Sequence, residues 1–380
     1  MRIGMSAYRF NQQGGIERAS YELARQLSAQ GEDVTLLAED VDPAPEQPLS
    51  WQRVTMPRVP GFLIPGVYPG RATRALRDHG FDILHNQGGC ALRQQDVITA
   101  HSCHRAWWKM KLAHGEKARA LLNPHHRVVL HMERLNYRPG AYSRVIAVSG
   151  GVGREVTAHY DVPADRIRVI PNAVDIARFQ PADAAARRAR VRAQHGIDRD
   201  DVVLLWVGKE FRRKGLAPLI SALPHLPPHA KALVIGGDDR APYQALAKRL
   251  GVGSRVIFAG HSSHVEDYFT GGDIFVFPTL YEAFALVTLE AAAAGLPLVT
   301  TRVNGTEDFV VEGQNGMFIE RDSASIARTL RPLVDSAELR GRMADAARHA
   351  VAGYTWDAVA RRTREVYEEV LAERTARPGR

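Results

Sequence analysis

The chain has 380 residues, of which 45% are hydrophobic and 24% are charged. This composition is that of an ordinary globular protein and excludes a disordered or fibrous one. Such a length favours two domains, each large enough for its own core. The formal net charge of +8 indicates either an anionic partner or a basic solvated surface, and the charge alone leaves both interpretations open.

Cysteine content and the apolar segments bear on the compartment. The two cysteines, Cys90 and Cys103, form neither a disulfide framework nor a metal-ligand pattern, which favours a reducing compartment. Residues 1–6 lack the apolar core of a signal peptide and are predicted to form a strand. The longest apolar region, residues 274–299, excludes a transmembrane helix because prolines and carboxylates interrupt it at Pro278, Glu282, Glu290 and Pro297. We therefore expect a cytoplasmic protein.

Short apolar segments alternate with longer amphipathic ones in the first half of the chain. Gly14-Gly15 separates a first strand from a helix predicted over residues 16–29, and Ser149 is placed to cap another helix. The predicted strands are residues 2–6, 33–38, 82–85, 96–101 and 144–149. This β-α-β alternation predicts a parallel sheet with helices on both faces. The proline-rich stretch 40–60 is predicted to be an irregular loop.

A second cycle of strands begins after Pro171-Asn172. Its predicted strands are residues 201–208, 231–237, 255–260, 274–278 and 298–301, and a long amphipathic helix is predicted over residues 355–373. We therefore predict an α/β protein with two doubly wound Rossmann-like domains, residues 1–171 and 172–355. Ligands of such sheets bind beyond the carboxyl ends of the strands, and we expect these edges to face each other across a cleft.

The segment EAFALVTLE, residues 282–290, places two carboxylates eight residues apart before the helix breaker Gly295-Leu-Pro297. On a helix this spacing is about 12 Å along the axis and returns to nearly the same side. The pattern predicts Glu282 at a helix N-terminus and Glu290 two turns further on. A nucleotide sugar fits this arrangement, because it carries hydroxyls at both ends and a diphosphate in the middle that a helix N-terminus attracts. The alternative is a charged helix face.

The loop GKEFRRKG, residues 208–215, follows a predicted buried strand, so its cations project from the carboxyl end of that strand. Lys209 and Lys214 are predicted to converge on a diphosphate and to offset the charge of a departing nucleoside diphosphate. Arg212 and Arg213 are assigned to the solvated side of the loop. The alternative is a charged surface loop without a ligand.

Two further signals are weaker. Gly14-Gly15 would let the backbone approach a phosphate at a helix N-terminus, but the same pair occurs in plain tight turns and lacks the full dinucleotide fingerprint. His101 ends the strand predicted over residues 96–101, where it could hydrogen-bond a sugar hydroxyl or shuttle a proton. The alternative for His101 is an ordinary buried histidine.

The remaining polar patterns give no metal site and one basic region. Asp40-Val-Asp42 and Asp198-Arg-Asp200 match a D-x-D pattern, but both lie in polar, loop-like surroundings and are interpreted as solvated. Residues 101–138 combine tryptophans with many cations, which suits an anionic membrane surface, a phosphorylated acceptor or single-stranded nucleic acid. The alternative is an amphipathic pair of helices with buried tryptophans.

Taken together, these motifs resemble the family 4 glycosyltransferases, which are retaining enzymes of the GT-B fold. The matching motifs occur in order along nearly the whole chain: GGIER (14–18), DILH (82–85), TAH (99–101), VIAVS (145–149), VIPNAVD (169–175), residues 208–215, residues 282–290 and the tail at Trp356. The resemblance implies that the C-terminal helix, residues 356–380, packs back onto the N-terminal domain.

The resemblance also implies a role for each matching residue. Glu282 would hold the donor hexose, Glu290 the ribose hydroxyls, and His101 the donor sugar near the reaction centre. The donor diphosphate would be bound by Lys209, Lys214, Gly14, Gly15 and the backbone amides of Ala285, Leu286 and Val287. Three positions depart from the common pattern: Lys209 stands where arginine is frequent, Ala285 where glycine is usual, and Asn304-Gly305 where Gly-Gly is common.

A retaining enzyme of this kind implies departure and attack on the same face of the sugar through an oxocarbenium-like state, with no enzymic nucleophile, no metal and no cofactor. Glu282, Lys214 and His101 would act at the reaction centre. Within the family, the N-terminal pattern and residues 101–138 are most similar to lipopolysaccharide-core glucosyltransferases. This implies transfer of a hexose from a UDP-sugar to a lipid-linked saccharide, with peripheral attachment to the inner membrane face as an option.

Other functions are compatible with the same residues. A GT-B epimerase or phosphorylase, or a transferase acting on a small molecule or another glycan, would use a similar donor site. A basic membrane-binding or nucleic-acid-binding module is suggested by charge alone, and it leaves the ordered glutamate and lysine motifs unexplained. We therefore expect a nucleotide sugar and a saccharide as partners, with an anionic membrane surface as a further option, and no nucleic acid.

Overall fold

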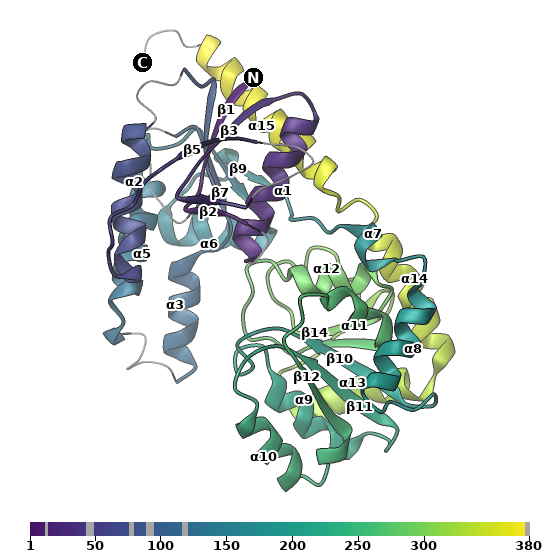
Figure 1. The fold of residues 1–380 in the computed structure, drawn as a ribbon. Helices are drawn as coiled ribbons and strands as arrows, with labels where there is room; N and C mark the ends of the chain where they lie inside the picture. The colour runs from purple at the N-terminus through teal and green to yellow at the C-terminus, as the bar shows by residue number, and fades with distance from the viewer. Residues whose placement is uncertain (12–13, 43–48, 76–79, 89–94, 116–120, 377–380) are drawn as a thin grey trace. The chain divides into compact units, whose positions relative to one another are not determined.

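The computed structural model describes all residues except 12–13, 43–48, 76–79, 89–94, 116–120 and 377–380. The chain divides into two compact units, which are described separately: Met1–Ala173 together with Trp356–Arg380, and Val174–Thr355. Each unit contains a parallel sheet with helices packed against it (Figure 1), so the prediction of two α/β units is confirmed.

The first unit is built on a seven-stranded sheet with the order β5-β3-β1-β6-β7-β8-β9. Its strands are β1 (Arg2–Ser6), β3 (Asp33–Ala38), β5 (Ser50–Arg53), β6 (Ile83–Asn86), β7 (Val97–Ala100), β8 (Arg144–Ala147) and β9 (Ile167–Val169). Every pairing in this sheet is parallel. The central strands are buried, as expected for a sheet covered on both faces.

The prediction of an irregular loop over residues 40–60 is wrong in part. Asp40–Val41 (β4) pairs with Arg9–Phe10 (β2), and β5 pairs with the edge of β3. Residues 43–48 lie outside the described residues. The side chains of β5 are exposed or half-buried, so its sequence lacks the alternating pattern of a strand. The strand forms because β3 offers a free edge with which it pairs.

Helices flank this sheet, and several begin as their sequences predict. They are α1 (Gly15–Ala29), η1 (Gly61–Leu63), α2 (Ile64–Ala75), α3 (His104–Ala113), α5 (Pro124–Asn136), α6 (Gly150–Tyr160), η2 (Ala164–Arg166) and α15 (Trp356–Ala376). The amide of Val152 donates to the Ser149 hydroxyl at 3.0 Å, which confirms the predicted cap of α6.

The tail helix α15 packs in the first unit although it follows the second one in sequence (Figure 1). It lies against α1 and contributes Ala360, Val366, Tyr367 and Val370 to the buried core. At its far end Glu369 accepts from Arg144 and Arg168, at 3.2 Å and 2.7 Å. Glu373 also accepts from Arg144. These contacts fix the helix across strands β8 and β9.

The second unit is built on a six-stranded sheet with the order β12-β11-β10-β13-β14-β15. Its strands are β10 (Val202–Val207), β11 (Ala230–Ile235), β12 (Val256–Gly260), β13 (Ile274–Phe277), β14 (Leu298–Thr300) and β15 (Gly316–Phe318). All pairings are parallel. Strand β10 is buried along its whole length, and its Trp206 belongs to the main core of the unit.

The helices of the second unit fall into two groups by their contacts. One group is α9 (Leu216–Ala222), α10 (Ala241–Arg249) and α13 (Ser323–Asp335); the other is α7 (Ile176–Phe179), α8 (Ala184–Gln194), α11 (Val265–Gly271), α12 (Leu286–Ala293) and α14 (Ala337–Val351). The 3-10 turn η3 (Leu223–His225) follows α9, and the 3-10 turn η4 (Gly253–Arg255) follows α10. Two groups of helices around one parallel sheet are typical of a doubly wound unit.

Part of the basic character of the chain is used inside the second unit. The arginine-rich helix α8 packs on α11. Arg187 pairs with Asp267 at 2.7 Å, and Arg188 and Arg192 pair with Asp273 at 2.6 Å and 3.2 Å. Arg187 therefore joins the two helices, and Arg188 and Arg192 bind the turn that follows α11. None of the three requires an anionic partner outside the protein.

His85 makes the stability of the first unit depend on pH. Its side chain is fully buried between β7 and α15, where its ring nitrogens lie 2.6 Å from the Tyr367 hydroxyl and 2.7 Å from the Thr99 hydroxyl. Burial, with a smaller contribution from His101, lowers the pKa of His85 from 6.5 to about 3. Below pH 6.5 the unfolded chain binds a proton that the folded chain does not.

We therefore predict that the free energy of unfolding falls, as the pH drops from 6.5 towards 4, by roughly 1.4 kcal/mol per pH unit on account of His85. Urea titrations across this range measure the slope. His85→Gln should make the slope shallower by that amount, and His114→Gln, at an exposed position, is the matched control. An unchanged slope in His85→Gln would contradict the assignment.

Candidate functional site

The strand order of the second unit reverses between β10 and β13, and doubly wound sheets bind ligands at such a point, beyond the carboxyl ends of the strands. Two loops leave the sheet there: residues 208–215 after β10 and residues 278–285 after β13. The Leu280 amide donates to the Arg213 carbonyl at 2.9 Å, which joins the two loops.

Glycine allows these loops to approach each other. Gly215 has φ +79°, and a Cβ there would lie 1.9 Å from the carbonyl oxygen of Pro278. A Cβ on Gly208 would lie 2.5 Å from Cδ of Lys214. Any larger residue would therefore push the two loops apart or displace the Lys214 side chain.

Glu282 lies in the loop before α12, so the prediction that it begins a helix shared with Glu290 is wrong. The helix starts at Leu286, with Ala285 as its N-cap. Three side chains contact one carboxylate oxygen of Glu282 and fix its position in the loop. Arg213 Nη1 lies 2.8 Å away and the Thr279 hydroxyl 3.1 Å away, and Lys214 Nζ lies 4.0 Å away.

The assignment of Arg213 to the solvated side of its loop is also wrong. Its side chain is only 17% exposed and bonds both Glu282 and Glu210. Burial acts to lower the pKa of Arg213, but the two carboxylates raise it overall. Arg213 therefore stays charged and fixes Glu282 in place. The sequence signal was present in the RRK run, but the spacing alone does not say which cation turns inward.

The two lysines of this loop lie in different surroundings. Lys214 is 16% exposed, and its ammonium lies 5.1 Å from the centre of the Phe277 ring. Lys209 is exposed. Lys214 is thus a preorganised cation beside Glu282, whereas Lys209 is free to reach a ligand from solvent.

The first turn of α12 contains the backbone amides predicted to bind phosphate. No side chain caps this helix, and Ala285 has φ −77°, so the alanine that replaces a usual glycine is unstrained. The Leu286 amide already donates to the Phe284 carbonyl at 2.9 Å. Glu290 lies on the same helix and is 9% exposed. An uncapped helix start of this kind favours an anion.

His101 follows β7 in the first unit, and its Nε2 lies 3.1 Å from Oε1 of Gln87, the residue after β6. Burial lowers the pKa of His101 to about 4. The ring is therefore neutral near pH 7, which suits hydrogen bonding to a sugar and excludes a protonated acid at that pH. Gln87 was missed by sequence reasoning, although its position directly after a predicted strand was a usable signal.

Gly14 and Gly15 begin helix α1, with Gly14 as an extended N-cap. A Cβ on Gly14 would lie 1.9 Å from a carboxylate oxygen of Glu17, so the Glu17 side chain covers Gly14. The Glu17 charge also interacts favourably with the helix dipole. Residues 12–13 lie outside the described residues. Gly14-Gly15 and His101 belong to the first unit, whereas Glu282, Lys214 and Glu290 belong to the second.

Helices α3 and α5 pack on each other, which agrees with the helical pair predicted for residues 101–138. The buried tryptophans of that interpretation are wrong, because Trp107 and Trp108 on α3 are only half-buried. Glu133 of α5 is buried and accepts from the amides of His104 and Arg105 at the start of α3. Leu121 and Leu122, just before α5, are 54% and 82% exposed. This cation-rich region therefore also exposes two apolar side chains.

Within the described ranges, no group of three or more histidine, cysteine or acidic side chains could hold a metal ion. In the same ranges, no helix is long and apolar enough to cross a membrane. Asp40 lies on β4, and the Asp198 amide donates to the Asp201 carboxylate at 2.6 Å.

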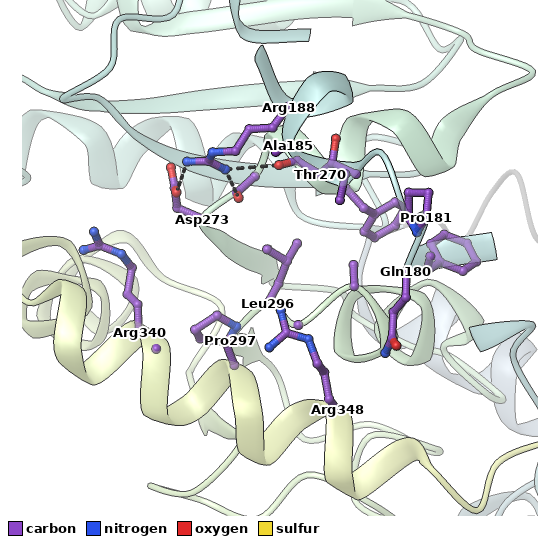
Figure 2. Close-up of a pocket in the computed structure, with 18 residues that line it drawn as sticks. Gln180, Pro181, Ala185, Arg188, Thr270, Asp273, Leu296, Pro297, Arg340 and Arg348 are labelled. Carbon is purple, nitrogen blue, oxygen red and sulfur yellow. Dashed lines mark hydrogen bonds and ion pairs between the residues drawn. The ribbon is translucent and has the colours of Figure 1, made fainter. Parts of the chain in front are cut away.

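A pocket of about 480 Å³ opens at the opposite, amino-terminal edge of the second sheet (Figure 2). Its three arginines each lie against the carboxyl end of another helix. Arg188 donates to the Thr270 and Gly272 carbonyls at the end of α11, and Arg340 donates to two carbonyls near the end of α13. Arg348 lies over Gly295 after α12. These arginines offset the negative ends of helix dipoles, so this pocket is structural.

Two smaller pockets lie at the same carboxyl-terminal edge as Glu282. One, of about 370 Å³, includes Thr279 and Arg321. The other, of about 320 Å³, follows β11 and β12 and includes Asp238 and His261. This edge thus combines cations, an uncapped helix start, a fixed carboxylate and open pockets.

Comparison with known proteins agrees with this geometry. The family model described as Glycosyltransferase Family 4 matches residues 13–178, and the model described as Glycosyl transferases group 1 matches residues 187–350. A D-inositol 3-phosphate glycosyltransferase of Streptomyces scabiei is 27% identical, over 94% of this chain and 87% of that protein. The lipopolysaccharide glucosyltransferase WaaG of Escherichia coli is 24% identical, over 92% of this chain and 94% of that protein.

Solved structures with the same fold include WaaG, with a TM-score of 0.80, 23% identity and coverage of 96% of this chain and 99% of that one. Anabaena Alr3699/HepE in complex with UDP and glucose has a TM-score of 0.72 and 19% identity, over 97% of this chain and 99% of that one. The two family models together span most of the chain and meet in the segment between the two sheets. The chain therefore belongs to family 4 of the glycosyltransferases and is a retaining hexosyltransferase with the GT-B fold.

Proposed function

We propose that this glycosyltransferase moves a hexose from a UDP-sugar to a lipid-linked saccharide of the lipopolysaccharide-core type, in the synthesis of a cell-envelope glycan. The observation that carries the donor half is the fixed carboxylate of Glu282 beside Arg213, Lys214 and the uncapped start of α12. UDP and glucose in the related fold of Alr3699/HepE support the same donor class.

In this proposal, cations and backbone amides bind the diphosphate. Lys214 is held beside Glu282, Lys209 reaches in from solvent, and the amides at Ala285 and Val287 meet the phosphates at the first turn of α12. Gly14 and Gly15, which belong to the first unit, are also assigned to the phosphates. These groups stabilise the charge that builds on the leaving diphosphate, which is the step where such contacts matter most.

Glu282 and Glu290 hold the two ends of the donor. Glu282 positions the hexose hydroxyls. One of its carboxylate oxygens is committed to Arg213 and Thr279, and in this proposal the other accepts from the sugar. Glu290 binds the ribose hydroxyls. His101 accepts a hydrogen bond from the sugar as a neutral ring.

Retention follows from attack on the face that the diphosphate leaves. The bond from the anomeric carbon to the diphosphate oxygen breaks, and the acceptor oxygen bonds to the same carbon from the same side. The departing phosphate oxygen takes the proton of the acceptor hydroxyl. Glu282 therefore positions the sugar and is no nucleophile, and Lys214 balances charge on the leaving group.

The proposed acceptor is argued from the surface of the first unit and from the similar proteins. WaaG acts on lipopolysaccharide and matches this chain over nearly its whole length. The exposed Leu121 and Leu122 beside the cations of α3 and α5 suit an anionic lipid surface. A phosphorylated cyclitol is a second candidate acceptor, because several D-inositol 3-phosphate glycosyltransferases are similarly related. We therefore expect a cytoplasmic enzyme that binds the inner membrane face peripherally.

A thermal-shift titration with UDP-glucose, UDP-galactose and UDP-N-acetylglucosamine tests the donor class, with GDP-mannose as the comparison. The preferred donor at a concentration of 100 Kd should stabilise the protein by about 2.7 kcal/mol. Stabilisation by GDP-mannose alone would contradict the UDP assignment, and the absence of any shift would contradict the donor site.

Glu282→Ala should reduce sugar transfer by at least about 100-fold while leaving UDP affinity within a few-fold, because the hexose loses its positioning group. Product formation and UDP binding are measured in parallel. Glu210→Gln is the matched control, since Glu210 also accepts from Arg213 but is 57% exposed. Turnover of Glu282→Ala close to that of the unchanged protein would refute the role.

Sedimentation with phosphatidylglycerol vesicles at low salt tests membrane attachment. We expect the protein to sediment with anionic vesicles and to be released as salt screens the charge. Leu122→Glu should weaken this binding, and Val311→Glu, an equal change at a residue of the second unit that is 48% exposed, should not. Failure of the unchanged protein to bind anionic vesicles would overturn the membrane part of the proposal.

A further inference from the structure

The strand order of the first unit reverses between β1 and β6, and a cluster of buried polar side chains lies next to that point. Gln87 follows β6, His101 follows the neighbouring strand β7, and Ser20 comes from helix α1, which follows β1. The side chains of Gln87 and Ser20 are buried, and Gln87 Oε1 lies 3.1 Å from His101 Nε2 and 3.4 Å from the Ser20 hydroxyl. Nothing described above explains why an amide is buried here.

His85 determines which way the Gln87 amide points. The in-plane positions of the His85 ring are taken by Tyr367 of α15 and Thr99 of β7, at 2.6 Å and 2.7 Å. Gln87 Nε2 lies 3.2 Å from one ring nitrogen and 3.3 Å from the other. In the plane of the ring, a point equally far from both nitrogens would clash with the carbon between them, so the amide lies over the ring face.

An aromatic face attracts an N–H group and repels a carbonyl oxygen. The NH₂ group of Gln87 therefore faces His85, and the carbonyl oxygen faces His101. A carbonyl oxygen only accepts hydrogen bonds. The Ser20 hydroxyl has a closer acceptor in the Ile16 carbonyl, at 2.9 Å, so the carbonyl of Gln87 is available to His101.

We infer that Gln87 is a positioning residue that holds His101 as the tautomer with hydrogen on Nε2, which leaves Nδ1 as an acceptor for a hydroxyl of the donor sugar. No described residue hydrogen-bonds Nδ1 of His101. Since the hydrogen bond at one ring nitrogen sets the state of the other, the chain Tyr367–His85–Gln87–His101 connects the tail helix to the donor sugar. This inference rests on the proposed function only for the identity of the group that meets Nδ1.

The first test is spectroscopic and needs no substrate. Nitrogen–proton correlation spectra of the full chain with labelled histidines report the tautomer of each ring, and His101→Gln identifies the His101 signals. We expect a neutral ring with hydrogen on Nε2 at pH 7.5. Hydrogen on Nδ1, or a doubly protonated ring, would overturn the inference whatever the enzyme transfers.

The second test separates positioning from mere structure. Gln87→Met keeps the length of the side chain but removes the acceptor, and we expect it to lower kcat by on the order of 10-fold to 100-fold with little change in UDP affinity. In a His101→Ala background, Gln87→Met should have no further effect, because its action passes through that ring. An equal loss in both backgrounds would show that Gln87 acts elsewhere.

Gln87→Glu keeps an acceptor towards His101 and adds charge, so its readout is a shift in pH dependence and not a loss of activity. The carboxylate should raise the pKa of His101 and shift the acidic limb of the pH–activity profile upwards, while the Nε2–H tautomer persists in the spectrum. An acidic limb at its original pH would count against the contact. If the tautomer is as expected but no sugar is transferred from any UDP donor, the proposed function fails and the Gln87–His101 assignment stands.

Discussion

The ion pair between Arg213 and Glu282 holds together the two loops from which the candidate donor site is built. Both side chains are largely buried. Removing the arginine would leave the Glu282 carboxylate with Lys214, 4.0 Å away, as its charged partner among the described residues, whereas removing the glutamate would leave Arg213 paired with the exposed Glu210. The pair needs the close approach of the β10 and β13 loops, which Gly215 and the bond between Leu280 and Arg213 permit. One carboxylate is thereby fixed before any ligand arrives, and fixed groups are what transition-state stabilisation requires.

The first unit uses a related arrangement with neutral groups. His85 and Gln87 are both buried. His85 is hydrogen-bonded to Thr99 and to Tyr367 of the tail helix, and Gln87 lies over the His85 ring and reaches His101. Burial keeps His85 and His101 uncharged by lowering the pKa of each, so this network orients a ring without introducing charge. Because α15 follows the second unit in sequence, the same network also ties the last helix of the chain to the central strand β6 of the first sheet.

The charge of the chain has several separate uses. The arginines of α8 bind α11, those around the pocket of Figure 2 lie at helix ends, and Arg144 and Arg168 bind the tail helix. Near the candidate donor site, Lys214 lies beside Glu282 and Lys209 is exposed. A net charge of +8 is therefore a poor guide to the partner, whereas the position of each cation is informative.

The sequence by itself determined the two α/β units, most of the strands to within a few residues, the family and the nucleotide-sugar donor, because hydrophobic periodicity and short motifs are local properties. The short edge strands β5, β9 and β15 were not predicted. Only the tertiary structure decided that α12 begins at Leu286, after Glu282. The hydrogen bond that fixes Glu282 in the preceding loop comes from Arg213, 69 residues away. The tertiary structure also turned Arg213 inward, placed Gln87 on His101 and joined Tyr367 to His85 across 282 residues. Contacts of that range depend on how sheet edges and helices meet in space, and no local pattern records them.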